Sequence, residues 1–322
     1  MLENTHSWAG ICENFLEQWK HKFKTPEQRR KFSKWFAERE KVGYLFDNTM
    51  IYRVWKIANW LNTERDHFIV ISGGEGSGKS TLATQIGSWL SPNGFSIIDM
   101  CYTSQQYLTR MSEKTRKILS TEDRNSIPQD VLVLDEAGTQ LLSRQSLSSS
   151  NVSLTKSFFA QRALKFLIIL CVPNFFFLDT VIREHRVKSL IHITKRGTYK
   201  LITGKGIKTV SEFGKKTKQI SKVTLGLSDF IYGNFSKKFP KTVDKEQYEI
   251  QKLEAIDELL TGLKDDFVEQ KLFPASKVAK ELGITTNTLI NHIQNRQIQG
   301  KQINARWYIS REAYNKLISL EN

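Results

Sequence analysis

The stretch GGEGSGKST, from Gly73 to Thr81, decides the fold of this chain. It follows the apolar run HFIVIS and opens the amphipathic run KSTLATQIGSWL, so a strand, a glycine-rich loop and a helix are predicted in that order. The stretch matches the pattern G-x-x-x-x-G-K-[ST], in which glycines let backbone N–H groups and the helix N-terminus face phosphates. The predicted nucleotide-binding residues are Gly73, Gly74, Glu75, Gly76, Ser77, Gly78, Lys79, Ser80 and Thr81.

A second motif, VLVLDEAG at residues 131–138, favours this interpretation over a chance glycine-rich turn. In a site built from both motifs, Lys79 reaches the β- and γ-phosphates of ATP and the Ser80 hydroxyl binds Mg²⁺. Asp135 ends the short apolar strand and holds Mg²⁺ through its water shell, while Glu136 orients and polarises the attacking water. The alternative for Glu136 is a solvated loop acid. Lys79 and Glu136 are therefore candidate catalytic residues, and Ser80 and Asp135 are candidate metal ligands.

The most apolar segment of the chain, ILCVPNFFFLD at residues 169–179, is interrupted by Pro173 and Asn174. The run is too short for a membrane-spanning helix, which needs about 20 residues, and it is polar at its centre. We interpret KFLIILCV as a buried strand and expect Asn174 at its carboxyl end, where open α/β sheets place ligand-contacting residues. Asn174 is thus a third candidate catalytic residue, a sensor of the γ-phosphate or of the attacking water. A turn that only closes the strand is the alternative.

Short apolar runs alternate with longer amphipathic segments between residues 67 and 203. The predicted strands are HFIVIS, FSIID, VLVLD, KFLIILCV and SLIHIT, which carry β-branched or aromatic residues. Alternating strands and helices predict an α/β fold with a parallel sheet covered by helices on both faces. The turn sequence KRGT at residues 195–198 predicts a hairpin that joins SLIHIT to TYKLIT.

These motifs resemble those of the P-loop ATPases that carry a glutamate after the second motif and a polar sensor on an added strand. This group holds AAA+ proteins, RecA-like motors and the FtsK/HerA DNA pumps. The resemblance implies that Gly73–Thr81 is the Walker A loop, that Asp135 and Glu136 are the Walker B pair, and that Asn174 is the sensor. The sequence shows no clear helical lid with a sensor arginine, which favours a RecA- or FtsK/HerA-like core. The resemblance also implies a homo-oligomeric ring, with a hexamer as one candidate size, in which a neighbour's arginine completes the site; the candidates are Arg144, Arg162, Arg183 and Arg186.

Five segments are predicted along the chain. They are a tryptophan-rich helical region (1–64), a P-loop ATPase core (65–203), a basic loop region (204–243), a connecting helix (244–271) and a winged helix-turn-helix domain (272–322). The tryptophans are interpreted as helical core or a subunit contact rather than a base-stacking surface. The basic loop contains Lys215, Lys216 and Lys218, which suit contacts with DNA phosphates, although a solvated face explains them equally well. The connecting helix packs on a neighbouring domain or, alternatively, forms a coiled-coil contact.

The last segment has apolar residues at the spacing that two packed helices need, with a turn at Gly283 and a small hairpin after the second helix. It resembles the winged helix-turn-helix of the MerR and excisionase type over residues 273–320, most clearly in the phrase NARWYISREAYNKL. The resemblance implies that the second helix enters the major groove of DNA. The implied DNA contacts are Thr285, Thr286, Asn287, Asn291 and His292 on that helix, and Arg296, Lys301 and Arg306 in or near the wing. A three-helix protein-interaction module is the alternative.

The charge balance of the 322 residues indicates a polyanionic partner. Lys plus Arg number 48 against 33 Asp plus Glu, a net charge of +15, which points to nucleic acid or an anionic membrane. The three cysteines stand in no metal-ligand pattern, as in proteins of a reducing interior. The start of the chain lacks the pattern of a signal peptide. We therefore expect a cytoplasmic protein without a membrane partner, in the host cytoplasm if the protein is viral.

Two classes of function use all of these features. The first is a DNA-stimulated ATPase that works as a motor or remodeller on DNA. The second is a nucleotide-switched protein that binds a DNA site for replication initiation, helicase loading or partition. A small-molecule kinase is a weaker third class, because it leaves the C-terminal segment and the positive charge unused. A compact ATPase joined to an excisionase-like domain is typical of viruses and mobile elements, so we expect such an origin.

Overall fold

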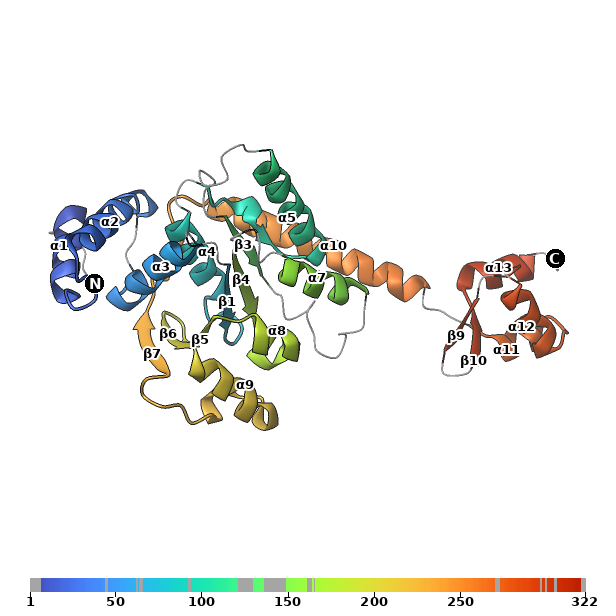
Figure 1. Cartoon of the computed structure of the whole chain (residues 1–322). Coiled ribbons are helices and arrows are strands. Elements are labelled where there is room, and N and C mark those ends of the chain that lie inside the picture. Colours follow the sequence, from blue (N-terminus) through green and yellow to red (C-terminus); the bar gives the residue numbers. More distant parts are fainter. Residues whose placement is uncertain are drawn as a thin grey trace. The chain divides into compact units, whose positions relative to one another are not determined.

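The computed structural model describes residues 7–43, 46–61, 63, 66–91, 94–120, 130–135, 149–160, 164, 166–269, 273–295, 297–298, 300–303 and 306–319. The chain divides into two compact units, Met1–Ile250 and Gln251–Asn322 (Figure 1). Within the described residues, no helix is both long enough and apolar enough to cross a membrane.

Among the described residues, three α-helices precede the sheet: α1 (Trp8–Gln18), α2 (Pro26–Ala37) and α3 (Asn48–Leu61). Helix α2 begins with a capping box, in which Thr25 Oγ1 accepts from the Gln28 N–H and the Gln28 side chain accepts from the Thr25 N–H. Aromatic side chains of this region pack together and against Trp89, which is fully buried on α4 (Lys79–Leu90). The tryptophan-rich region is therefore a helical layer that shares an aromatic core with the helix after the glycine-rich loop.

In the described part of the chain, seven strands form one sheet in the order β2-β3-β4-β1-β5-β6-β7. The first five in this order pair in parallel, namely β2 (Met100–Cys101), β3 (Val131–Leu134), β4 (Leu167–Val172), β1 (His67–Ser72) and β5 (Ser189–Lys195). Strand β6 (Thr198–Thr203) extends the sheet antiparallel to β5, and β7 (Phe230–Asn234) pairs antiparallel with β6. The predicted hairpin between β5 and β6 is present, with Gly197 at φ 90° in its turn.

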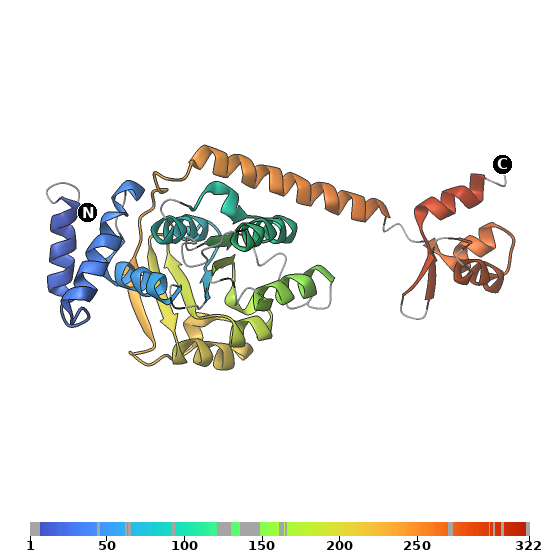
Figure 2. The same cartoon turned by 45° about the horizontal axis from the view of Figure 1, so that its top comes forward.

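Helices cover both faces of this sheet, as the alternation of elements predicts (Figure 2). Phe68 and Val70 of β1 belong to a buried apolar cluster with side chains of α5 (Ser104–Leu119), α7 (Ser149–Ala160), α8 (Thr180–His185) and α9 (Lys205–Thr217). Ile69, between them in sequence, points to the opposite face, where Ile57 of α3 and Ile86 of α4 lie. The α/β fold with a mostly parallel sheet is therefore confirmed.

Two predicted elements are wrong. FSIID is not a strand, because Ile97–Asp99 form a short 3-10 helix and only Met100 and Cys101 pair with β3. The buried Asp99 carboxylate causes the difference: it accepts a hydrogen bond from the Ser96 N–H and forms ion pairs with Arg110 and Lys114 of α5.

The predicted basic loop (204–243) is also wrong as a loop, since it contains helix α9 and strand β7. Ile207 and Val210 are buried three residues apart on α9, while Lys216 and Lys218 are exposed. This spacing makes an amphipathic helix that completes the sheet's cover. In the sequence, the many lysines of this segment make the helical spacing of its apolar residues difficult to recognise.

Helix α10 (Lys245–Glu269) starts within the larger unit and runs past its boundary. The smaller unit then contains β8 (Phe273–Pro274), α11 (Ala275–Glu281), α12 (Thr286–Gln294), β9 (Gly300–Ile303), β10 (Arg306–Ile309) and α13 (Arg311–Ser319). Its core includes Val278, Leu289, Ile293 and Ile309. Gly283, with φ 62°, makes the turn between α11 and α12. The order of helix, turn, helix, hairpin and helix is the order that the sequence predicts, and its role in DNA binding stays a prediction.

Candidate nucleotide-binding site

The glycine-rich loop between β1 and α4 is closed on itself by its lysine. Lys79 Nζ donates hydrogen bonds to the carbonyl oxygens of Gly73, at 3.1 Å, and Gly74, at 3.0 Å. Gly76 and Gly78 have φ angles of 65° and 98°, a region that glycine adopts without strain. Among the described residues, the buried Ser77 hydroxyl has no hydrogen-bond partner. A cation folded over the loop and an orphaned hydroxyl both fit a cradle for phosphate oxygens.

The sheet register brings the predicted site residues to one edge. Strand β4 lies between β1 and β3, with Val172 opposite Ser72 and Leu170 opposite Leu134. The glycine-rich loop, Asp135 and Asn174 therefore leave the sheet at the same edge. Asp135 is 1% exposed, and its backbone N–H donates to the carbonyl oxygen of Cys101 at 2.8 Å. A buried carboxylate beside a phosphate loop fits the oxygen ligands that Mg²⁺ prefers.

Tyr248, near the start of α10, joins this site and was not predicted from the sequence. Its hydroxyl donates a hydrogen bond to Asp135 Oδ2 at 3.3 Å, and the Ser80 side chain lies beside it. Burial, followed by the charge of Asp135, raises the pKa of the Tyr248 phenol, which therefore stays protonated. No motif marks this tyrosine, because it lies on a polar helix 113 residues after Asp135.

Asn174 lies at the carboxyl end of β4, as predicted, but its side chain forms hydrogen bonds with two backbone groups of the protein. Its Oδ1 accepts from the Phe176 N–H at 3.0 Å and caps a short helix, and its Nδ2 donates to the Lys218 carbonyl oxygen at 3.0 Å. These bonds correspond to the turn alternative. The sensor role stays a prediction, and it requires Asn174 to exchange one of the two bonds for a nucleotide contact.

Two of the four candidate trans-acting arginines do not fit that role. Arg186 is 2% exposed and forms a buried ion pair with Asp66. Arg183 is 6% exposed, bonds to Thr180 and lies over the ring of Phe176. An arginine that completes a neighbour's site must extend from the surface, so burial removes both of these candidates. Arg144, Arg162 and the predicted base Glu136 lie outside the described residues.

The candidate DNA contacts lie in both units. Lys216 and Lys218 are exposed at the end of α9, whereas the side chain of Lys215 is outside the described part. On α12, Asn287, Asn291 and His292 are exposed and Thr286 is partly buried. Thr285 is exposed but caps α12 through its hydroxyl, which accepts from the Thr288 N–H. Arg306 is exposed on β10, whereas Arg296 and the side chain of Lys301 are outside the described residues.

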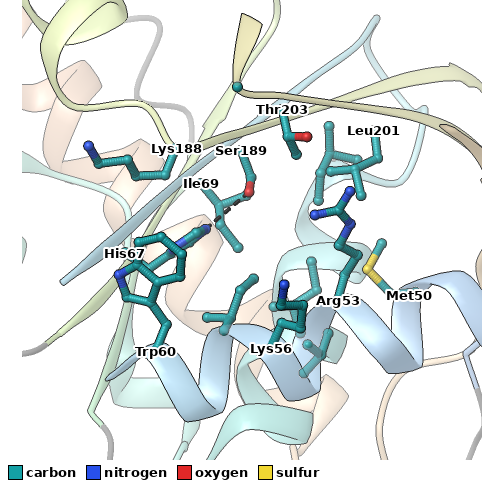
Figure 3. Close-up of a pocket in the computed structure, with 15 residues that line it drawn as sticks. Met50, Arg53, Lys56, Trp60, His67, Ile69, Lys188, Ser189, Leu201 and Thr203 are labelled. Carbon is teal, nitrogen blue, oxygen red and sulfur yellow. Dashed lines mark hydrogen bonds between the residues drawn. The ribbon is translucent and has the colours of Figure 1, made fainter. Parts of the chain in front are cut away.

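A separate cavity of about 280 Å³ lies at the amino ends of β1 and β5, away from the glycine-rich loop (Figure 3). Its walls are mostly apolar, and His67 hydrogen-bonds Ser189 in it at 3.0 Å. Arg53, Lys56 and Lys188 also line it. Since it is at the opposite end of the strands from Lys79, it is not the nucleotide site.

His67 should make the stability of the larger unit depend on pH. Burial lowers its pKa to about 4, so the folded protein keeps it neutral where an unfolded chain, with an ordinary histidine pKa of about 6.5, protonates it. The unfolded state then binds the extra proton, and stability falls as the pH drops from 6.5 towards 4. Between pH 7 and pH 5 we expect His67 to account for a loss of about 2 kcal/mol in the free energy of unfolding.

Urea denaturation at both pH values tests this expectation. His67→Gln should reduce the pH-dependent loss by about 2 kcal/mol, and His185→Gln, at an exposed histidine, should leave it unchanged. An equal loss in wild type and His67→Gln would show that other groups cause the pH dependence.

Comparisons with known proteins agree with this geometry. The family model described as "ATPase family associated with various cellular activities (AAA)" matches residues 69–194. The match is therefore to AAA. A RecA- or FtsK/HerA-like core was expected, because the sequence shows no clear helical lid with a sensor arginine. A thymidylate kinase of Protochlamydia amoebophila (strain UWE25) is 42% identical over 64 residues, which are 20% of this chain and 27% of the kinase. The match thus spans about a quarter of that relative.

Solved structures show more distant similarity. The HORMA:CdnC:Trip13 complex of E. coli MS115-1 aligns with a TM-score of 0.36 and 14% identity, over 60% of this chain and 74% of that one. The N-terminal domain of zonular occludens toxin from Neisseria meningitidis aligns with a TM-score of 0.31 and 14% identity, over 57% of this chain and 98% of that one. Similarity at this level supports no inference about function. The family match, the glycine-rich loop and the parallel sheet together identify residues 69–194 as an AAA-type ATPase domain of the P-loop NTPase class.

Proposed function

We propose that this chain is a DNA-binding ATPase that acts as an oligomeric, ATP-driven DNA motor or remodeller, such as a translocase, packaging or helicase-like protein of a virus or mobile element. The observation that carries the proposal is the convergence of the glycine-rich loop, Asp135 and the end of β4 on one edge of the sheet. Bound ATP with Mg²⁺ supplies the phosphoanhydride bond and the charge that polarises it.

The residues of the site divide the work in this proposal. Lys79 turns from its own loop carbonyls to the β- and γ-phosphates, and the backbone N–H groups of the loop bind the remaining phosphate oxygens. Ser80 and Asp135 hold Mg²⁺. Glu136, which directly follows Asp135 in sequence, takes up the proton of the attacking water. A ring of copies would bring an arginine from a neighbour.

DNA is the proposed partner because of charge and surface chemistry. The chain carries a net charge of +15, and exposed lysines end α9. Exposed amide side chains at Asn287 and Asn291 form a polar face on α12, and amides pair well with base edges. Lysine contacts with phosphates would hold the protein on DNA of any sequence, and base contacts from a helix would provide preference for a particular site.

A nucleotide-switched, site-specific DNA-binding protein for replication initiation, helicase loading or partition is the second candidate. The polar face of α12 favours it, because a site reader needs base contacts and a motor does not. The glycine-rich loop and the short similarity to a thymidylate kinase are compatible with a small-molecule kinase, but that class leaves the C-terminal segment and the positive charge unused.

Two sets of substitutions separate the DNA contacts. Replacing Lys215, Lys216 and Lys218 by Ala should weaken binding to all DNAs and reduce the log–log salt slope by up to about three units. Replacing Thr286, Asn287 and Asn291 by Ala should instead erase preference for a site, at about 1–3 kcal/mol for each lost base contact, and spare non-specific affinity. Fluorescence anisotropy with random and selected DNA, over a range of salt, measures both effects.

The matched control replaces Lys20, Lys31 and Lys34 by Ala. This change removes the same charge from exposed lysines of the helical layer and should leave the salt slope unchanged. An equal loss of site preference in the lysine and helix variants would contradict the proposal that the lysines contact phosphates and that α12 contacts bases. The motor is favoured if the lysine variant loses the stimulation of ATP hydrolysis by DNA. The switch is favoured if the α12 variant loses it.

A further inference from the structure

The segment from Phe235 to Tyr248, called the strap here, crosses from β7 to α10 against the nucleotide site. At the start of the strap, the Phe235 ring packs against Gly78. A Cβ atom added to Gly78 would lie 3.3 Å from this ring. Gln85 of α4 then donates from Nε2 to the carbonyl oxygens of Ser236, at 2.8 Å, and Lys238, at 2.7 Å. The strap is therefore attached to the glycine-rich loop and to the helix that the loop begins.

The far end of the strap is fixed by aromatic residues. Tyr248 is 4% exposed, and its ring packs against Phe239 with centroids 5.0 Å apart and against Tyr102 with centroids 6.0 Å apart. The Tyr102 hydroxyl donates to the Tyr248 carbonyl oxygen at 3.4 Å. Tyr102 directly follows β2, which pairs with the strand that ends at Asp135. The Tyr248 phenol is thus held at one position relative to the site.

That position is between the two residues expected to hold Mg²⁺. The Tyr248 hydroxyl donates to Asp135 Oδ2 at 3.3 Å and lies beside the Ser80 side chain. Mg²⁺ and its water shell need the oxygen lone pairs of the same two side chains and require near-octahedral geometry around the ion. A phenol that already donates to Asp135 beside Ser80 occupies space that the ion's shell must enter.

We propose that Tyr248 is a magnesium-sensing residue, which holds Ser80 and Asp135 when no nucleotide is bound and is displaced when Mg²⁺–nucleotide binds. Displacement detaches the end of the strap and frees the first turn of α10, the helix that continues into the smaller unit. The chemistry of the signal is the divalent cation with its nucleotide phosphates, rather than the base or the ribose. This inference rests on the proposed nucleotide site.

The first test is the affinity of Tyr248→Phe for a fluorescent ADP analogue, measured with Mg²⁺ and with EDTA. Removing the hydroxyl removes the hydrogen bond to Asp135 that competes with the ion, so binding with Mg²⁺ should tighten by about 3- to 10-fold. Binding in EDTA should not change. Tyr102→Phe is the matched control, since it removes a hydroxyl that donates to the strap backbone, at the Tyr248 carbonyl oxygen. Any effect of Tyr102→Phe should be equal with Mg²⁺ and with EDTA.

The second test is hydrogen exchange of residues 236–250 followed by mass spectrometry, which does not depend on activity. In wild type, Mg²⁺–ADP should increase exchange in this segment, and ADP with EDTA should not. In Tyr248→Phe, exchange should already be high without nucleotide.

The outcomes separate this inference from the proposed function. Wild type that binds Mg²⁺–ADP with no change in strap exchange, together with an unchanged affinity of Tyr248→Phe, overturns the sensing role and leaves the nucleotide site intact. Wild type that binds no nucleotide under either condition overturns both.

Discussion

Replacing Lys79 by Ala is expected to lower ATP hydrolysis by about 10³-fold or more, the upper range for a single group that stabilises transition-state charge. Lys79 places a cation within the glycine-rich loop, where its Nζ lies 3.1 Å from the Gly73 carbonyl oxygen. Its charge acts on the β- and γ-phosphates before and during the reaction, so nucleotide binding should weaken as well. Steady-state phosphate release and titration with a fluorescent nucleotide measure the two effects.

The control for this substitution is Lys188→Ala. Lys188 is exposed at the opposite end of the strands from the loop, so the change removes the same charge without touching the site. Thermal melting of both variants checks the fold, because Lys79 is buried and its loss leaves two loop carbonyls without their donor. A folded Lys79→Ala protein that hydrolyses ATP at the wild-type rate would remove the glycine-rich loop from the reaction.

Replacing Glu136 by Gln should separate binding from chemistry. Glutamine keeps the shape of the side chain but cannot accept the proton of the attacking water, so hydrolysis should fall by about 10²- to 10⁴-fold while ATP still binds. The variant should accumulate as an ATP-bound assembly, which size-exclusion chromatography with ATP would detect. Glu13→Gln makes the same chemical change at an exposed side chain of α1, outside the nucleotide site, and should remain active. Normal turnover in Glu136→Gln would mean that Glu136 is a solvated acid.

Much of the ATPase domain could be predicted because its signals are local. The glycine-rich loop requires a strand before it and a helix after it, and the apolar runs report burial directly, so β1, β3, β4 and β5 follow from the sequence. Strand β4, which is followed by Asn174, lies between β3 and β1, so it is next to the strand that leads into the glycine-rich loop, as expected.

The parts that could not be predicted depend on contacts between distant residues. FSIID has strand composition, yet Asp99 forms ion pairs with α5 and ends a short 3-10 helix instead of a strand. Arg186 looks like any basic residue in the sequence, and only its ion pair with Asp66, 120 residues away, shows that it is structural. Tyr248 reaches Asp135 across 113 residues, and no spacing rule links a tyrosine on a polar helix to a metal site.

The most direct test of the account is steady-state ATP hydrolysis by the purified chain, with and without double-stranded DNA, and with Lys79→Ala as the blank. The account predicts hydrolysis that requires Mg²⁺, that increases when DNA of any sequence is added, and that disappears in Lys79→Ala. Hydrolysis that is the same with and without DNA and that persists in Lys79→Ala would contradict it.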